Sequence, residues 1–517
     1  MHSTSLLRWL ALAAVAVLPG VTALGSVPFP KDDPFYQPPS WNWQSKSPGD
    51  ILKDRKVQAA TIGALKYDLD AYQLQYRSTN PKNQPSWGVT TVLVPHNAKK
   101  DHVVTMSAPE NSNNLNCAPS YAMRHTGVIE FDNFQPRWEQ LLYTLHLQEG
   151  WIVNAPDHEG PSSAFADGYI AGRMVLDSMR AVTRYEPLGI PKNAMFIGHG
   201  YSGGAISNGW AASLHNVYAP ELNVVGWSLG GTPSDEKALL NAIDDGPLAG
   251  LVVASMSGLI DGYPEILKDV LLDGHFTDVA RKAYETAHKV CNYEMVWRYF
   301  GEKIQSSKYM NGPTNFTSYK KVDDLLDTLR MGKYPKYVPK KPVFMIHSAI
   351  DEVIPWFMAN RTAVDWCNQG ANVRFLTETS PDMNHVSTYL ENLPYYVMFM
   401  RDRFAGKDYY NGGCHFDAKY TSPLMDVSIL GERFKETLQA VNTIMGHEVG
   451  KKDSILRKKV KDRKNPDKHG LAHIPALKSK KITPGEGGNK SPESKSASAK
   501  YKHLKKANKH KQLSSNN

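Results

Sequence analysis

The stretch Ala194-Met195-Phe196-Ile197-Gly198-His199-Gly200-Tyr201-Ser202-Gly203-Gly204-Ala205 decides the fold of this chain. It starts as a short apolar run, typical of a buried strand, and then carries the pattern Gly-x-Ser-x-Gly. We expect a helix to begin near Ala205. The serine of this pattern stands on a strained turn between strand and helix, and small neighbours are needed for close packing. The pattern therefore predicts that Ser202 is a nucleophile, with the N-terminus of the helix facing developing negative charge.

A second match to the pattern lies at residues 226–230 and contains Ser228. It also follows an apolar run. However, the next residues, Thr232-Pro233-Ser234-Asp235, are typical of a loop and a new helix cap. A helix therefore cannot start directly after Ser228, and Ser202 is the better candidate.

Short apolar, β-branched runs alternate with segments of helical spacing along the chain. The expected strands lie at 90–94, 103–106, 151–154, 194–198, 224–227, 343–347 and 373–377, and the expected helices include 172–185, 205–215 and 358–369. This alternation predicts an α/β fold with a mostly parallel sheet and flanking helices. Residues from about 233 to 335 break the rhythm with helical segments at 239–243, 251–260, 266–271 and 279–300. They predict a helical cap inserted over an edge of the sheet.

A catalytic acid and a base are expected after the serine, each following a strand. Asp351 comes just after the expected strand 343–347, and Glu352 is its direct competitor. His385 follows the expected strand 373–377 and is placed to take the proton of Ser202, while the acid holds the imidazole ring. The histidines at 347 and 415 are more typical of structural positions, one inside a strand and one beside a cysteine.

The first 23 residues have the pattern of a secretory signal peptide. Arg8 precedes the apolar run 9–18, and small residues permit cleavage after Ala23. No later stretch is long and apolar enough for a transmembrane helix, so we expect a secreted, extracellular protein. The chain has four cysteines, and in that compartment this even number is consistent with two disulfides. Glycosylation sequons begin at Asn315 and Asn360 in the body, and a third begins at Asn489.

The net charge of +9 belongs to one end of the chain. Residues 451–517 hold 20 Lys and Arg against five Asp and Glu, whereas residues 1–450 hold 40 against 46. The tail 451–517 has few large apolar residues and is predicted to be disordered. It is basic enough to bind anionic lipid, cell wall or polysaccharide, although a solvated tail without a partner is an open alternative. The whole chain is 41% hydrophobic, a composition that excludes wholesale disorder. We therefore expect residues 24–450 to form the folded body.

The residues resemble those of the fungal secretory lipase family, of the Candida antarctica lipase A type. The resemblance covers about residues 30–430 and combines many short motifs. They are Asp-Pro-Phe-Tyr-Gln-Pro-Pro at 33–39, Pro-Gly-Asp-Ile-Leu at 48–52, Cys-Ala-Pro-Ser-Tyr at 117–121, Ala-Pro-Asp-His-Glu-Gly-Pro at 155–161, Val-Leu-Asp-Ser-Met-Arg-Ala at 175–181, Gly-Tyr-Ser-Gly-Gly at 200–204, Tyr-Ala-Pro-Glu-Leu at 218–222, Asp-Glu-Val-Ile-Pro at 351–355 and Arg-Asp-Arg-Phe-Ala-Gly at 401–406.

This resemblance implies an α/β-hydrolase with a helical cap that hydrolyses esters, typically acylglycerols, at a lipid interface. It implies Ser202, Asp351 and His385 as the catalytic triad. It also implies two disulfides, with the pairs Cys117 with Cys291 and Cys367 with Cys414. A carboxylesterase, or a deacetylase acting on a soluble or secondary-metabolite ester, is the alternative function.

The resemblance further implies an oxyanion hole. The first donor is expected to be the backbone N–H of Gly203. The family tends to have Glu-Asp-Ser upstream of the first cysteine, where this chain has Glu110-Asn111-Ser112. Since Asn donates hydrogen bonds at every pH, we expect Asn111 to supply the second donor. No metal site, organic cofactor or specific nucleic-acid partner is expected, because ligand-spaced Cys/His clusters and phosphate-binding glycine loops are not found.

Overall fold

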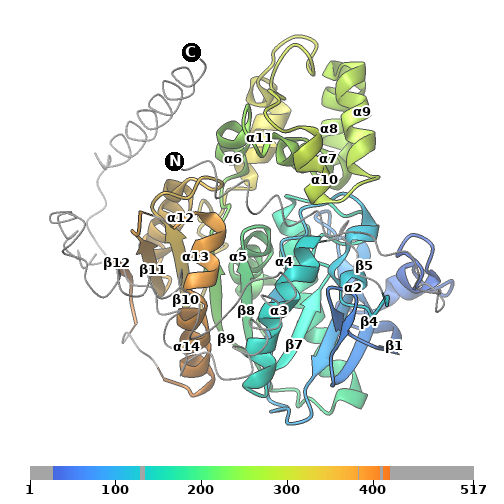
Figure 1. The fold of residues 1–517 in the computed structure, drawn as a ribbon, viewed down its shortest axis with the longest axis vertical. Coiled ribbons are helices and arrows are strands. Elements are labelled where there is room, and N and C mark those ends of the chain that lie inside the picture. Colours follow the sequence, from blue (N-terminus) through green and yellow to red (C-terminus); the bar gives the residue numbers. More distant parts are fainter. Residues whose placement is uncertain (1–26, 128–133, 382, 408–411, 420–517) are drawn as a thin grey trace, which may run out of the picture.

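The central feature of the structure is one large mixed sheet. The computed structural model describes residues 27–127, 134–381, 383–407 and 412–419. Within them, ten strands pair in the order β1-β4-β5-β7-β6-β8-β9-β10-β11-β12. The strands from β7 to β12 in this order are parallel to one another, and β1, β4 and β5 join antiparallel at one end. The predicted mostly parallel α/β sheet is confirmed (Figure 1).

All seven expected strands are present, and three more complete the sheet. The strands are β1 (Ile51–Val57), β4 (Asp70–Thr79), β5 (Pro85–Val94), β6 (His102–Ser107), β7 (Ile152–Pro156), β8 (Met195–Tyr201), β9 (Val224–Gly230), β10 (Val343–Ser348), β11 (Val373–Glu378) and β12 (His415–Lys419). Strand β4 was not expected because it is rich in polar residues. Its buried Gln73 and Gln75 donate to the carbonyls of Ser120 and Phe35. Only tertiary contacts make such a strand acceptable in the interior.

Helices cover both faces of the sheet. Successive residues of each apolar strand point to opposite faces, so both faces need to be buried. Phe196 of β8 faces the core formed with α4 (Gly168–Arg184), α5 (Gly203–Tyr218) and α12 (Trp356–Asn368). The next residue, Ile197, faces the core formed with α3 (Phe134–Gln148) and α14 (Leu393–Phe404). Strands buried on both faces appear in the sequence as continuous apolar runs. For this reason these strands could be predicted from the sequence.

A group of helices follows β9 and lies above the sheet in Figure 1. It consists of α6 (Glu236–Ile243), α7 (Ala249–Gly262), α8 (Pro264–Leu267), the π-helix η6 (Lys268–His275), α9 (Asp278–Ala287), α10 (Asn292–Arg298) and α11 (Lys320–Thr328). We call these the cap helices. The helical segment expected at 279–300 is two helices, because α9 ends at Ala287 and the chain turns at residues 288–290. Cys291 then precedes α10 and is disulfide-bonded to Cys117.

Both ends of the chain fall outside the described residues. This applies to the predicted signal peptide 1–23, to the basic tail 451–517 and to the sequon at Asn489. Of the helices that the structure describes, none combines the length and the apolar character needed to cross a membrane.

Candidate active site

Ser202 stands on a tight turn between β8 and α5. Its backbone has φ 53° and ψ −124°, a conformation that L-residues rarely adopt. The turn needs glycine on both sides. A Cβ atom at Gly200 would lie 2.0 Å from the carbonyl oxygen of Gly204, and one at Gly204 would lie 1.9 Å from that of Ser107. Helix α5 starts directly at Gly203, two residues before the expected start near Ala205.

Asp351 and His385 come together beside this turn. Asp351 follows β10, and His385 is the first residue of α13 (His385–Glu391), which follows β11. The imidazole Nδ1 lies 2.7 Å from the Asp351 carboxylate, and both side chains are buried. The other carboxylate oxygen accepts hydrogen bonds from the backbone N–H groups of Val353 and Ile354 at 2.9 and 2.7 Å. The carboxylate is therefore held in one orientation toward the ring.

The buried pair shifts the pKa values of both partners in opposite directions. Burial alone would lower the pKa of His385, but the charge of Asp351 and their hydrogen bond raise it above its usual value. Burial would raise the pKa of Asp351, whereas the interactions with His385, with His347 and with the backbone lower it. The ion pair favours a carboxylate and an imidazole that readily accepts a proton at Nε2.

The imidazole lies close to the serine turn. Its Cε1 would be 2.7 Å from a Cβ atom at Gly231. The preceding residue, Gly230, accepts the hydrogen bond of the Ser202 backbone N–H at 2.9 Å. The His385 Nε2 atom is buried and has no hydrogen-bond partner among the described residues. It is thus a free acceptor or donor in the immediate surroundings of Ser202.

The competing candidates occupy other positions. Glu352 does not contact the imidazole ring nitrogens; its carboxylate accepts the backbone N–H of His385 at 2.9 Å. The buried His347 ring hydrogen-bonds to the carbonyl of Ile354 at 2.9 Å, and His415 lies in the edge strand β12.

Ser228, from the second match to the serine pattern, is fully buried within β9. Its hydroxyl lies 3.0 Å from Nδ1 of His199. Burial lowers the pKa of that histidine to about 3, so the ring stays neutral. Ser228 therefore belongs to a buried polar contact between β8 and β9.

Asn111 lies against the start of α5. Its backbone is left-handed, with φ 51°, and its N–H donates to the carboxylate of Glu159 at 2.9 Å. Ser112 N–H donates to the same carboxylate at 3.3 Å. The Asn111 side chain packs on Gly203 so closely that a Cβ atom there would lie 1.8 Å from Asn111 Oδ1. The two residues expected in the oxyanion hole are thus adjacent.

Glu159 is a residue whose role the sequence did not reveal, although it lies in the quoted motif at 155–161. It is buried with Glu110 and Asp157, and burial raises the pKa of all three carboxyls, that of Asp157 to about 7. By binding two consecutive N–H groups, Glu159 holds the loop around Asn111 in its tight turn.

The two predicted glycosylation positions differ in their surroundings. Asn315 is exposed, and its side chain accepts the N–H of Thr317. Asn360 lies within α12, and Thr362 of its sequon is fully buried, with its hydroxyl bonded to Ser234. Glycosylation at either position stays a prediction.

Three comparisons show which known proteins this chain is similar to. The family model described as secretory lipase matches residues 128–412. The chain is 56% identical over 510 residues to a secreted triacylglycerol lipase of Malassezia globosa, covering 98% of this chain and 89% of that one. It is 52% identical over 511 residues to one of Malassezia restricta, covering 99% and 100%. The structure is similar to that of Candida antarctica lipase A in its closed state, with a TM-score of 0.71 and 28% identity over 80% of this chain and 96% of that one. The expected α/β-hydrolase fold is confirmed.

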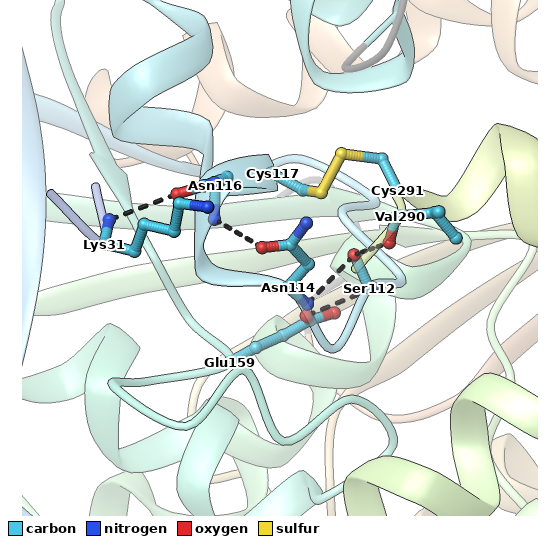
Figure 2. Close-up of a disulfide and its surroundings, with 8 residues drawn as sticks. All are labelled: Lys31, Ser112, Asn114, Asn116, Cys117, Glu159, Val290 and Cys291. Carbon is cyan, nitrogen blue, oxygen red and sulfur yellow. Dashed lines mark hydrogen bonds between the residues drawn. A yellow bond between two sulfur atoms is a disulfide. The ribbon is translucent and has the colours of Figure 1, made fainter. Parts of the chain in front are cut away.

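Two disulfides join segments that are distant in sequence, in the pairing that the resemblance implied. Cys117 is bonded to Cys291, and Cys367 of α12 is bonded to Cys414. Figure 2 shows the first bond beside Ser112, whose hydroxyl donates to the carbonyl of Val290 at 3.4 Å. This disulfide therefore ties the loop that carries Asn111 to the cap helices.

Removing either disulfide should lower thermal stability, and by different amounts. The bridges span 174 and 47 residues. By loop entropy they contribute roughly 5 and 4 kcal/mol, so the double variant Cys117→Ser/Cys291→Ser should lose about 1 kcal/mol more than Cys367→Ser/Cys414→Ser. Scanning calorimetry of both variants at one scan rate measures the difference. The opposite order of melting temperatures would contradict the entropic account.

Proposed function

The chain belongs to the secretory lipase family, and we propose that it is a secreted triacylglycerol lipase that acts through Ser202, Asp351 and His385. The observation that carries the proposal is the buried Asp351–His385 pair beside a serine on a strained turn. The names of the relatives in Malassezia supply the substrate class. The relatives are also named as secreted proteins, in agreement with the predicted signal peptide.

The residues divide the reaction into two acyl transfers. His385 Nε2 takes the proton of the Ser202 hydroxyl while Ser202 Oγ attacks the ester carbonyl. The tetrahedral intermediate collapses, the alcohol leaves with the proton from His385, and an acyl-serine remains. A water molecule, deprotonated by His385, then releases the fatty acid and regenerates Ser202. Asp351 holds the imidazole tautomer and stabilises the imidazolium in both steps.

The negative charge on the carbonyl oxygen requires hydrogen-bond donors. The N–H of Gly203 supplies the first donor, at the N-terminus of α5. The side-chain amide of Asn111 supplies the second. Two contacts support this assignment: the amide packs on Gly203, with its donor Nδ2 3.4 Å from where a Cβ atom would lie, and the Asn111 backbone N–H is already bound to Glu159.

The basic tail 451–517 supplies a separate function in this proposal. Its 20 Lys and Arg, against five Asp and Glu, attract anionic surfaces such as the headgroups of an acidic lipid layer. It lies outside the region matched by the family model. Its positive charge concentrates the enzyme at such a surface, whereas the residues proposed for the reaction all lie in the body, between 111 and 385.

The proposed function is tested by substrate and by variant together. The enzyme should hydrolyse both emulsified long-chain triacylglycerol and soluble p-nitrophenyl butyrate. Ser202→Ala should lose both activities and its labelling by a fluorophosphonate probe, because the nucleophile is gone. Ser228→Ala, which changes the buried serine of β9, should still be labelled. Activity on the butyrate alone would identify a carboxylesterase instead, and labelling that survives Ser202→Ala would remove Ser202 as the nucleophile.

The pH profile should depend on Asp351. Catalysis needs neutral His385, so kcat/KM falls as the pH drops below the raised pKa of that residue. Asp351→Asn removes the charge that raises this pKa, and the acidic limb should move to lower pH. The turnover number should also fall by about 10³- to 10⁴-fold, because the tautomer is no longer held. The exposed cap substitution Asp273→Asn removes the same charge elsewhere and should leave the profile in place.

Asn111→Ala should reduce the turnover number by about 10²- to 10³-fold, as expected for one lost oxyanion donor. The rate should fall at all pH values, since the amide does not titrate. Asn241→Ala, on the exposed side of α6, is the matched control and should have wild-type turnover. Unchanged turnover in Asn111→Ala would exclude this donor.

Deletion of residues 451–517 should weaken binding to anionic vesicles at low salt. Sedimentation with vesicles that contain phosphatidylserine measures the effect, which should vanish as ionic strength rises. Hydrolysis of p-nitrophenyl butyrate should be unchanged. Equal binding of both forms would refute the proposed role of the tail.

A further inference from the structure

Tyr201, the residue that precedes Ser202, contacts the proposed base, His385. Tyr201 is the last residue of β8 and is buried. Its hydroxyl donates a hydrogen bond to the backbone carbonyl of His385, at a distance of 2.6 Å. One peptide bond therefore separates the residue that supplies the nucleophile from the residue that contacts the base.

The ring of Tyr201 is held as firmly as its hydroxyl. It stacks on Tyr389, one turn after His385 in α13, with ring centroids 4.3 Å apart and an interplanar angle of 11°. Two glycines at the end of β9 leave room for it. A Cβ atom at Gly230 or Gly231 would lie 2.5 or 2.8 Å from the Tyr201 ring. Gly230, the last glycine of the second serine pattern, thus leaves space for Tyr201.

Glu352 binds the other end of the same residue. Its carboxylate accepts the backbone N–H of His385 at 2.9 Å. As the first residue of a helix, His385 has no intrahelical acceptor for this N–H. Helix α13 has only seven residues, and so short a helix is unstable without external contacts.

We propose that Tyr201 and Glu352 are positioning residues that clamp the main chain of His385 at its carbonyl and its N–H, so that Nε2 stays aligned with the Ser202 hydroxyl. This inference rests on the proposed function, because it takes His385 to be the base. Asp351 fixes the direction of the ring, whereas the clamp fixes the point from which the ring extends. A displacement of about 1 Å between reacting groups can cost roughly 10²-fold in rate.

The two halves of the clamp differ in charge and can be told apart. The groups that face His385 are Asp351 and Glu352 from the loop after β10, His347 from β10 and Tyr201 from β8. Glu352 adds to the raised pKa of His385 by its charge. Burial raises the pKa of Tyr201, which therefore stays a neutral hydrogen-bond donor.

Tyr201→Phe tests the carbonyl half, since it keeps the stacked ring and removes one hydrogen bond. The kcat for p-nitrophenyl butyrate, counted per serine labelled by a fluorophosphonate, should fall about tenfold. KM should stay within about twofold, and the acidic limb of the pH profile should not move. Tyr396→Phe is the matched control. It removes a buried hydroxyl of the same aromatic cluster that has no hydrogen-bond partner among the described residues, and it should have wild-type kcat.

A pair of substitutions tests the N–H half. Glu352→Gln keeps an acceptor oxygen and loses the charge, so kcat should stay near wild type while the acidic limb shifts to lower pH. Glu352→Ala loses both, and its kcat should fall about as far as that of Tyr201→Phe. Rescue by Gln distinguishes positioning from charge.

The outcomes separate this inference from the function on which it rests. If Ser202→Ala abolishes hydrolysis but Tyr201→Phe and Glu352→Ala retain wild-type kcat, the clamp is refuted and the lipase function stands. If Glu352→Gln is as slow as Glu352→Ala, Glu352 acts through its charge and that half of the clamp is refuted. If hydrolysis survives Ser202→Ala, the proposed function itself has failed.

Discussion

The strained backbone of Ser202 is the constraint on which the rest of the site depends. A positive φ at a non-glycine residue costs about 1–3 kcal/mol and persists only where the surroundings enforce it. Here the enforcement comes from two neighbouring strands. The carbonyl of Ser107 at the end of β6 lies where a Cβ of Gly204 would be, and the carbonyl of Gly230 at the end of β9 binds the Ser202 N–H. The turn therefore forms only when the sheet is assembled in its correct register.

The parallel sheet then brings the remaining groups to the same edge. Ser202 follows β8, Asp351 follows β10, and His385 follows β11, and β9 lies between the serine strand and the acid strand. For the imidazole to reach Ser202, the end of β9 must carry no bulky side chain. Gly230 and Gly231 meet this need, since a Cβ at Gly231 would collide with the ring of His385. The disulfide at Cys117 adds a covalent link from the neighbouring loop to the cap helices.

Much of the fold was predictable because buried parallel strands are recognisable by composition alone. The seven apolar runs were all strands, and Ser202, Asp351 and His385 were all placed after such runs. The polar strand β4 escaped prediction, because the burial of Gln73 and Gln75 depends on carbonyls that are far away in sequence. The break between α9 and α10 also escaped prediction: periodicity indicates a helical face, but it did not show that α9 ends at Ala287 and that a new helix begins after Cys291.

The sequence by itself determined which residue types stand at the carboxyl ends of which strands, since side-chain alternation and the serine pattern are local properties. It left open whether Asp351 or Glu352 faces the imidazole, as the two are adjacent and chemically alike. The tertiary structure decided this by directing Asp351 to the ring and Glu352 to the backbone of His385. It also decided that Gly230 of the second serine pattern leaves space for Tyr201, and that Tyr201 contacts His385. These outcomes depend on packing between segments that only the folded sheet brings together. No local sequence pattern encodes contacts between residues so far apart in the chain.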